Sequence, residues 1–336
     1  MTDAVRLAVV ASPRSGNTWL RLALARLYGL PHLAAHSLTD AEWATLPREC
    51  VVQIHWPWET RFADRLAREG FRVVTVARHP LDVLISILRF AVYEDTAPWL
   101  GGIGGGEGGL YGLTPRSDGF RAYASGPRAG ALLGVSRGWW GKPGVIGLRF
   151  ENLVADFPAE VGKVVAAVGR APGWSFAEAA EDTRIERLRP NSPNRHFWQG
   201  RPGLWRAFLP PAEAVALAGA VAGPMATFEY RADPDPGLTP EQADANWVRY
   251  HGRELAEAVR TESIPGRAAQ AENERLERVV SELEGRLQEL DRRLTDVLRL
   301  GRFPLTVARV TRRVMDRCPG LVRAARQVSG RRPSDS

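Results

Sequence analysis

The chain has 336 residues, of which 44% are hydrophobic and 25% are charged. This composition excludes a wholly disordered protein, and the length allows one domain of about 200–250 residues with an appendage, or two ordinary domains. Runs of about 18 apolar residues do not occur, so no transmembrane helix is expected. The two cysteines, Cys50 and Cys318, are too few and too far apart for a disulfide framework or a cysteine metal site, which favours a cytoplasmic protein.

The net charge of +7 comes from the end of the chain. Residues 301–336 hold nine arginines and two aspartates, and the other 300 residues hold 36 basic and 36 acidic side chains. The main part of the chain is therefore balanced, and we expect no nucleic-acid partner for it. The first residues run directly into an apolar strand, so we also expect no secretory signal.

Short apolar strands alternate with amphipathic helices through the first half of the chain. The expected strands cover residues 6–12, 51–55, 71–77 and 145–150, and the expected helices cover residues 18–28, 59–69, 80–90 and 151–168. This alternation predicts a parallel sheet with helices on both faces, and ligands of such sheets bind at the carboxyl ends of the strands. The glycine-rich run at residues 101–109 is either a mobile loop beside a substrate entrance or a plain surface insertion.

A heptad pattern begins after about residue 265. Apolar residues recur with the spacing 4-3-4-3-4-3, which is typical of an α-helical coiled coil, at Leu276, Val280, Leu283, Leu287, Leu290, Leu294 and Val297. We therefore expect a domain over residues 1–245, a linker or helix over 246–267, a coiled coil over 268–300 and a basic amphipathic or disordered tail over 301–336. The heptads at 276–297 favour a homodimer, and the alternative is one helix packed on its own domain. The tail is compatible with peripheral contact to an anionic inner membrane surface and equally with a solvated end.

Two clusters of polar residues follow expected strands. Residues 12–19, with the sequence S-P-R-S-G-N-T-W, lie between the first strand and the first helix, where backbone amides, hydroxyls and a cation form an anion site. The nucleoside-triphosphate loop has a different pattern, G-x-x-x-x-G-K-[ST]. Arg78 ends the third strand and Ser86 follows two turns into the next helix, so this pair forms a second candidate anion site. Two such sites at neighbouring strand ends indicate a nucleotide with phosphate groups at two positions.

In these motifs the chain resembles the sulfotransferases that use 3′-phosphoadenosine 5′-phosphosulfate (PAPS). Residues 13–19 match the family's 5′-phosphosulfate loop, P-[KR]-S-G-[TN]-T-W, and Arg78 and Ser86 have the spacing of its 3′-phosphate motif. Weaker matches follow in the family's order: residues 53–55 to K-T-H, residues 150–153 to Y-E-D-L, Thr183 and Ile185 to the adenine contacts, and residues 197–206 to R-K-G-x-x-G-D-W-K. The resemblance covers about residues 6–230 and implies a P-loop-like three-layer α/β fold around a central parallel sheet.

The resemblance also implies roles for individual residues. His55 would take the proton of the acceptor, and Arg14 would stabilise the charge on the leaving phosphate. No metal is implied. The residues that would bind PAPS, or its product adenosine 3′,5′-bisphosphate, are Arg14, Ser15, Gly16, Asn17, Thr18, Trp19, Arg78, Ser86, Thr183, Gln199, Gly200 and Arg201.

The sequence departs from the family's pattern at three places. Arg14 stands where the first loop usually has a lysine, and Gln53 replaces the lysine of K-T-H. The third place is the segment of residues 197–206, which we call the late loop. Trp198 and Gln199 stand there where the family has an arginine and a lysine facing the 3′-phosphate, so Arg195 or Arg201 would have to supply that charge.

The expected function is the transfer of a sulfuryl group from PAPS to a hydroxyl or amine of an unidentified acceptor, with a slight preference for a glycan or a lipid-linked glycan because of the basic tail. One alternative is a nucleotide kinase or hydrolase of the phosphate-loop superfamily, and the missing Gly-Lys-Ser/Thr argues against it. Another alternative is a non-catalytic scaffold protein with a sulfotransferase-like domain, for which Trp198 and Gln199 are the main support.

Overall fold

The structure is a computed structural model that describes residues 4–35, 40–91, 107–110, 112–189 and 197–250. The chain divides into two units, Met1–Ala256 and Glu257–Ser336, and the described residues all belong to the first unit. The expected coiled coil over 268–300, its dimer contact at 276–297 and the basic tail over 301–336 lie outside the described residues. The same holds for most of the linker over 246–267 and for the first part of the glycine-rich run.

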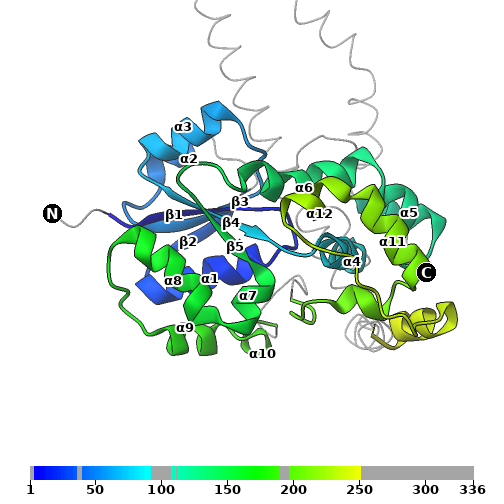
Figure 1. The fold of residues 1–336 in the computed structure, drawn as a ribbon. Coiled ribbons are helices and arrows are strands. Elements are labelled where there is room, and N and C mark those ends of the chain that lie inside the picture. The colour runs from blue at the N-terminus through cyan, green and yellow to red at the C-terminus, as the bar shows by residue number, and fades with distance from the viewer. Residues whose placement is uncertain (1–3, 36–39, 92–106, 111, 190–196, 251–336) are drawn as a thin grey trace, which may run out of the picture. The chain divides into compact units, whose positions relative to one another are not determined.

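A five-stranded, all-parallel sheet forms the centre of the first unit (Figure 1). Its strands are β1 (Arg6–Val10), β2 (His32–Ala35), β3 (Cys50–Ile54), β4 (Arg72–Ala77) and β5 (Val145–Arg149), in the spatial order β2-β3-β1-β4-β5. In the centre of the sheet, Val9 pairs with Gln53 on one side and with Val74 on the other. The parallel sheet and four of its strands were predicted from the apolar runs.

Strand β2 was not predicted from the sequence. It lies at the edge of the sheet, and its four residues alternate between exposed and half-buried. An edge strand of this kind needs no continuous apolar run, so its sequence H-L-A-A carries little strand signal.

Helices cover both faces of the sheet, which gives the expected three layers (Figure 1). Leu7 and Val9 of β1 point into one core, and Ala8 and Val10 point into the other. The first core is closed by α1 (Asn17–Tyr28), α7 (Phe150–Ala155), α8 (Phe157–Val168) and α9 (Phe176–Asp182), which is followed by the short α10 (Ile185–Leu188). The second core is closed by α2 (Asp40–Thr45), α3 (Thr60–Arg68), α4 (Pro80–Ala91), η1 (Glu107–Leu110), α5 (Asp118–Ala124), α6 (Pro127–Trp139), η2 (Leu204–Ala207), α11 (Pro211–Ala220) and α12 (Ala222–Thr227).

Local signals fix several helix ends. Gly70 follows α3 with φ of 74°, a left-handed conformation that glycine adopts without strain, and it ends that helix as predicted. The helix expected over 151–168 is two helices, because Asp156 interrupts it and its side chain accepts a hydrogen bond from the backbone N–H of Ala159. Pro158 then occupies the first turn of α8, where its missing N–H costs nothing.

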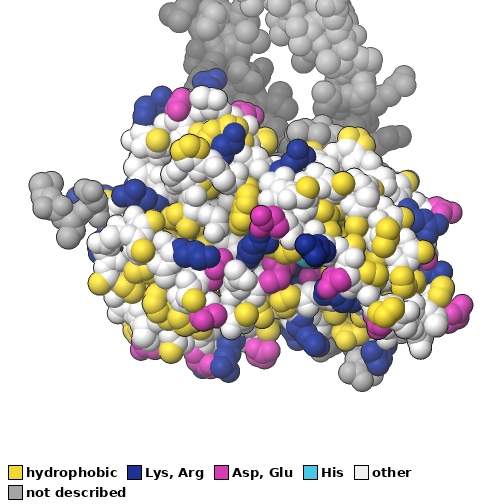
Figure 2. Space-filling view, viewed as in Figure 1, with side chains coloured by type: hydrophobic (Ala, Val, Ile, Leu, Met, Phe, Trp, Pro, Cys, Tyr) yellow, Lys and Arg dark blue, Asp and Glu magenta, His cyan; other side chains and the backbone are white. Residues whose placement is uncertain are grey.

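On the face shown in Figure 2, basic and acidic side chains are interspersed among hydrophobic ones. Charge of mixed sign on this face agrees with the balanced composition of the chain before residue 301. Among the described residues, the helices are too short or too polar to cross a membrane.

Candidate active site

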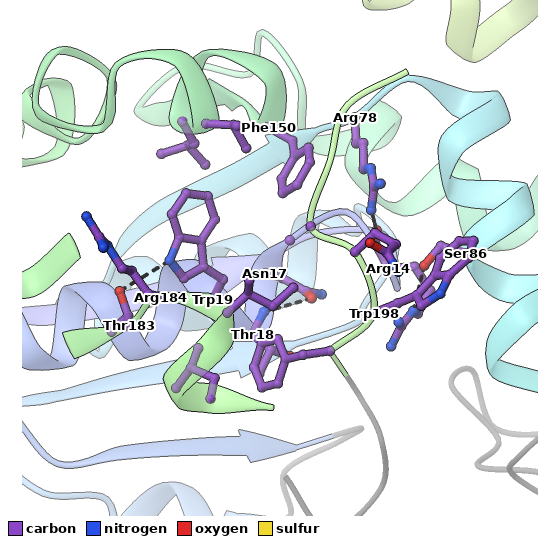
Figure 3. A pocket seen from close by; sticks show the side chains of 18 of the residues that line it. Arg14, Asn17, Thr18, Trp19, Arg78, Ser86, Phe150, Thr183, Arg184 and Trp198 are labelled. Carbon is purple, nitrogen blue, oxygen red and sulfur yellow. Dashed lines mark hydrogen bonds between the residues drawn. The ribbon is translucent and has the colours of Figure 1, made fainter. Parts of the chain in front are cut away.

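A cavity of about 560 Å³ opens at the carboxyl ends of the strands (Figure 3). Its volume lies within the range of small-molecule sites. It is lined by ten of the expected site residues, which come from five separate parts of the chain: Arg14, Gly16, Asn17, Thr18, Trp19, Arg78, Ser86, Thr183, Gln199 and Gly200. The resemblance therefore selected residues that the fold brings together. Ser15, His55 and Arg201 do not line this cavity.

The two ends of the cavity differ in chemistry. Figure 3 shows Arg14, Arg78 and Ser86 together at one end, and Trp19 and Thr183 at the other end. The walls between them include apolar side chains from α7, α8, α10 and the late loop, which are Phe150, Leu153, Phe157, Ile185, Leu188 and Phe197. A cavity with a basic end and an aromatic end suits a ligand that carries anionic groups at one end and a flat ring at the other.

Ser12 and Ser136 anchor the loop between β1 and α1 through hydrogen bonds. The backbone N–H of Ser12 donates to Ser136 Oγ at 2.7 Å, and the backbone N–H of Ser136 donates to Ser12 Oγ at 3.0 Å. Ser136 Oγ in turn donates to the carbonyl of Val76 at 2.7 Å, so α6 joins the ends of β1 and β4. Ser15 also belongs to this framework, because its hydroxyl donates to Ser12 O at 2.7 Å and its side chain is buried.

Gly16 allows the loop to turn into α1. Its φ is 97°, and a Cβ at this position would lie 2.5 Å from Cδ2 of Phe150. A side chain is therefore excluded both by the backbone conformation and by the aromatic ring. Gly16 gives the N-terminus of α1 no side-chain cap, and the backbone N–H of Thr18 donates to Asn17 Oδ1 at 2.9 Å. The N-terminus of a helix favours an anion.

Arg14 joins the two expected anion sites. Its side chain is buried, its Nε donates to Ser86 Oγ at 3.1 Å, and its guanidinium lies 4.7 Å from the centre of the Phe90 ring. Ser86 and Phe90 both belong to α4, one turn apart. The first loop and the second motif therefore form one basic region rather than two separate ones.

Arg78 connects this region to the late loop. Its guanidinium donates to the carbonyl of Arg14 at 3.0 Å and to the carbonyl of Arg201 at 3.3 Å, and it lies 4.4 Å from the centre of the Phe150 ring. Arg201 thus contributes its backbone, while its side chain is exposed. The Nε of Arg78 is buried and has no hydrogen-bond partner among the described residues.

Trp19 and Thr183 meet at the aromatic end although 164 residues separate them. The indole Nε1 of Trp19 donates to Thr183 Oγ1 at 3.2 Å, and Thr183 donates to the carbonyl of Ala179 at 2.7 Å. The Trp19 ring packs edge-on against Phe150 and at a tilt against Phe157. Thr183 was expected at the adenine and Trp19 at the same nucleotide, and both line the cavity.

The late loop is held through its backbone. The buried carboxylate of Asp82 on α4 accepts hydrogen bonds from the N–H of Gly203 at 2.6 Å and from the N–H of Trp205 at 3.0 Å. Trp198 lines the cavity with its ring stacked on Phe208, and its Nε1 is buried without a partner among the described residues. Arg195, one of the two arginines considered as a replacement charge, lies outside the described residues.

His55 lies just after β3 with a defined tautomer. Its Nδ1 is 2.7 Å from the carbonyl oxygen of Ala11, and a carbonyl only accepts, so Nδ1 carries the proton. Asn17 Nδ2 is 3.2 Å from the same nitrogen, but two donors do not bond, and this amide donates instead to Ser12 O at 3.3 Å. Nε2 of His55 is therefore the basic nitrogen of the ring, as a proton acceptor requires.

A second polar cluster stands behind the late loop, next to a cavity of about 580 Å³. The His79 ring stacks on Trp205 at 5.0 Å between centres, and its Nε2 lies 3.1 Å from the carbonyl of Arg231. Burial lowers the pKa of His79, and the nearby carboxylates of Asp82 and Glu151 oppose this effect. Burial, together with Glu151, raises the pKa of Tyr230, whose hydroxyl donates to that carboxylate.

Three residues that shape the site were not found by the sequence analysis. Ser136 and Asp82 act through contacts across 124 and 121 residues of chain, respectively, and such contacts leave no local pattern. Phe150 was noted as the first residue of a weak motif, but its role as the wall beside Gly16 was not recognised. Groups of three or more His, Cys, Asp or Glu side chains that could hold a metal ion were not found among the described residues.

No protein-family model matches the chain, and no curated protein matches it. Among solved structures, the mouse sulfotransferase SULT7A1 in complex with PAP is similar, with a TM-score of 0.52, 17% sequence identity, and coverage of 68% of this chain and 89% of that chain. Retinol dehydratase in complex with retinol and PAP has a TM-score of 0.43 and 15% identity, over 70% of this chain and 85% of that chain. The first likeness shows that the described unit has the fold of a sulfotransferase.

Proposed function

We propose that the protein is a sulfotransferase that takes a sulfuryl group from PAPS and gives it to a hydroxyl or amine of an acceptor. One observation carries the proposal: a single cavity has Arg14 and Arg78 at one end and Trp19 and Thr183 at the other. The donor nucleotide has the same polarity, with two anionic groups on its ribose and an adenine ring beyond it. The PAP named in the SULT7A1 complex is adenosine 3′,5′-bisphosphate, which supports the same assignment.

The reaction is a displacement at sulfur. The acceptor oxygen or nitrogen forms a bond to sulfur, and the bond from sulfur to the bridging phosphate oxygen breaks with its electron pair staying on phosphate. The acceptor proton goes to a base, so the products are a sulfated acceptor, adenosine 3′,5′-bisphosphate and a proton. Catalysis of this kind depends on alignment of the reacting groups and on stabilisation of the leaving charge.

The chain supplies a group for each task. Nε2 of His55 is the basic nitrogen of the ring, and its orientation is fixed by the 2.7 Å hydrogen bond from Nδ1 to Ala11 O. Arg14 would stabilise the leaving phosphate by charge and hydrogen bonding, because an arginine does not give up its proton. The backbone N–H groups at the start of α1, after Gly16, would bind the 5′-phosphosulfate.

Calorimetric titration separates this proposal from its two alternatives. We expect adenosine 3′,5′-bisphosphate to bind in the micromolar range without added metal, and ATP with Mg²⁺ to bind more weakly. Preference for ATP with Mg²⁺ would indicate a nucleotide kinase or hydrolase, and no binding of any nucleotide would indicate a scaffold protein. Arg78→Gln should weaken binding at least tenfold, whereas Arg61→Gln, at an exposed position on α3, is the matched control.

Activity is tested with PAPS labelled in the sulfuryl group and fractionated cell extract. The fraction that takes up label contains the acceptor. His55→Gln should lower turnover by about two orders of magnitude or more while the affinity for adenosine 3′,5′-bisphosphate stays within twofold. Unchanged turnover in this variant would exclude His55 as the base.

A further inference from the structure

Gln53 lies beside the basic nitrogen of His55. The two residues are two positions apart at the end of β3, so their side chains point to the same side of the sheet. The Nε2 atoms of Gln53 and His55 are 3.5 Å apart, and Gln53 is 5% exposed. Its other amide atom, Oε1, is buried and has no hydrogen-bond partner within the described part of the chain.

A buried amide oxygen without a partner is costly, by about 1–3 kcal/mol. Such a group in a native protein calls for an explanation, and a catalytic role is one of those known. For Gln53, that role depends on the protonation state of the neighbouring His55 ring. While His55 is neutral, its Nε2 carries a lone pair, and the amide nitrogen of Gln53 faces it as a donor.

When His55 takes up a proton, its Nε2 changes from a hydrogen-bond acceptor to a donor. The protonated ring carries N–H at both nitrogens, Nδ1–H still donates to Ala11 O, and Nε2–H then faces the amide nitrogen of Gln53, which is also a donor. A half-turn about the terminal torsion of Gln53 exchanges its nitrogen and oxygen without moving the rest of the side chain. This torsion has a broad, roughly twofold preference, so the half-turn causes no rotamer strain.

We propose that Gln53 is a positioning residue for His55, with its amide nitrogen toward the neutral ring and its Oε1 toward the protonated ring. The inference rests on the proposed function, because it is the acceptor proton that converts one state into the other. An amide serves both states, since it has a donor and an acceptor at equal reach. A lysine, which the resemblance places at this position, has three donors and no acceptor, and its charge opposes protonation of the ring.

Charged residues also follow the ends of other strands of the sheet, among them Arg14 after β1 and Arg78 after β4. A comparison of two neutral side chains at position 53 leaves all of these charges in place. Gln53→Met and Gln53→Leu therefore isolate the hydrogen bond from the surrounding field.

The test is a titration of His55 in the free protein by NMR with labelled histidine. The chain has six histidines, and the His55 signal is assigned by its loss in His55→Gln. We expect Gln53→Met and Gln53→Leu to lower the pH midpoint of His55 by about one unit, because the hydrogen bond lost from the protonated ring is stronger than the one lost from the neutral ring. Gln53→Glu, which offers only acceptors, should raise the midpoint. Gln242→Met, at an exposed position, is the matched control and should leave it unchanged.

A folded Gln53→Met or Gln53→Leu protein with an unchanged midpoint would overturn the inference, and either of the two variants suffices. The spectrum itself reports whether each variant is folded. In the sulfotransferase assay, the acid side of the pH profile of kcat/KM should move in the same direction as the midpoint, with nucleotide affinity unchanged within twofold. If no sulfuryl transfer is found, the proposed function fails, while the NMR titration still decides the relation between Gln53 and His55.

Discussion

Replacing Asp82 by asparagine tests how the late loop is held. The carboxylate is 1% exposed and accepts from the backbone N–H of Gly203 at 2.6 Å and from that of Trp205 at 3.0 Å. Asparagine has the same shape but one acceptor atom, so one of the two N–H groups would face an amide N–H₂ instead of an oxygen. Losing one hydrogen bond to a charged group and leaving one buried donor unpaired together destabilise the protein by about 3 kcal/mol.

This loss should lower the melting temperature by about 6–12 °C in a protein of this size. Tryptophan fluorescence during heating measures it, because Trp205 lies in the affected loop. We also expect at least a tenfold weaker affinity for adenosine 3′,5′-bisphosphate by calorimetry, since Gln199 and Gly200 line the cavity from the same loop. Asp64→Asn, at an exposed position on α3, is the matched control and should leave both measurements unchanged.

The two measurements separate two parts of the reasoning. If Asp82→Asn leaves the melting temperature unchanged, the carboxylate does not hold the loop. If stability falls as expected but the nucleotide binds as before, the loop is held by Asp82 but does not form a wall of the nucleotide site.

Three further predictions follow from other contacts. Gly16→Ala should weaken nucleotide binding at least tenfold, because the new Cβ would lie 2.5 Å from Phe150. It should also destabilise the protein by more than the cost of a left-handed backbone, which is about 1–2 kcal/mol. The control Gly70→Ala has φ of 74° and no atom within 4 Å, so it measures the backbone cost alone. Burial lowers the pKa of His79 in the folded state, so the unfolded chain binds more protons below about pH 6.5. Acidification below that pH should therefore lower the free energy of unfolding by up to about 1.4 kcal/mol per pH unit. In urea denaturation, the free energy of unfolding of His79→Phe should depend less on pH. Glu107→Gln should lower the free energy of unfolding by about 3–5 kcal/mol in the same measurement. The reason is that the carboxylate accepts a hydrogen bond from Arg128 Nε at 2.7 Å and both side chains are buried. A decrease below about 1 kcal/mol would contradict a structural role for the pair.

The strands of the sheet were predicted from local patterns, whereas most residues of the cavity were expected because of the resemblance to the sulfotransferases. Apolar runs mark buried parallel strands, and the turn from β1 into α1 needs a glycine at position 16 whatever the rest of the chain does. Arg78 lies in the turn between β4 and α4, and Ser86 lies two turns into α4, so a motif in sequence becomes a cluster in space.

The contacts that complete the site could not be predicted, because they join distant segments. Ser86 was expected to bind phosphate, and in the structure its hydroxyl accepts a hydrogen bond from Arg14. Ser15 was expected at the ligand, but its hydroxyl is used within the loop. The tautomer of His55 depends on the carbonyl of Ala11, 44 residues earlier, and no spacing rule contains that information.

The late loop is attached to its surroundings by main-chain atoms: Arg78 binds the carbonyl of Arg201, and Asp82 binds the N–H groups of Gly203 and Trp205. Every amino acid except proline offers these atoms, so these hydrogen bonds do not use the side chains of the loop. The rings of Trp198 and Trp205 add packing against Phe208 and His79, so the positions that tolerate change are those whose side chains are not buried. For protein engineering, the same stretch is a natural place to diversify, because new side chains there would be presented to the cavity on an unchanged path.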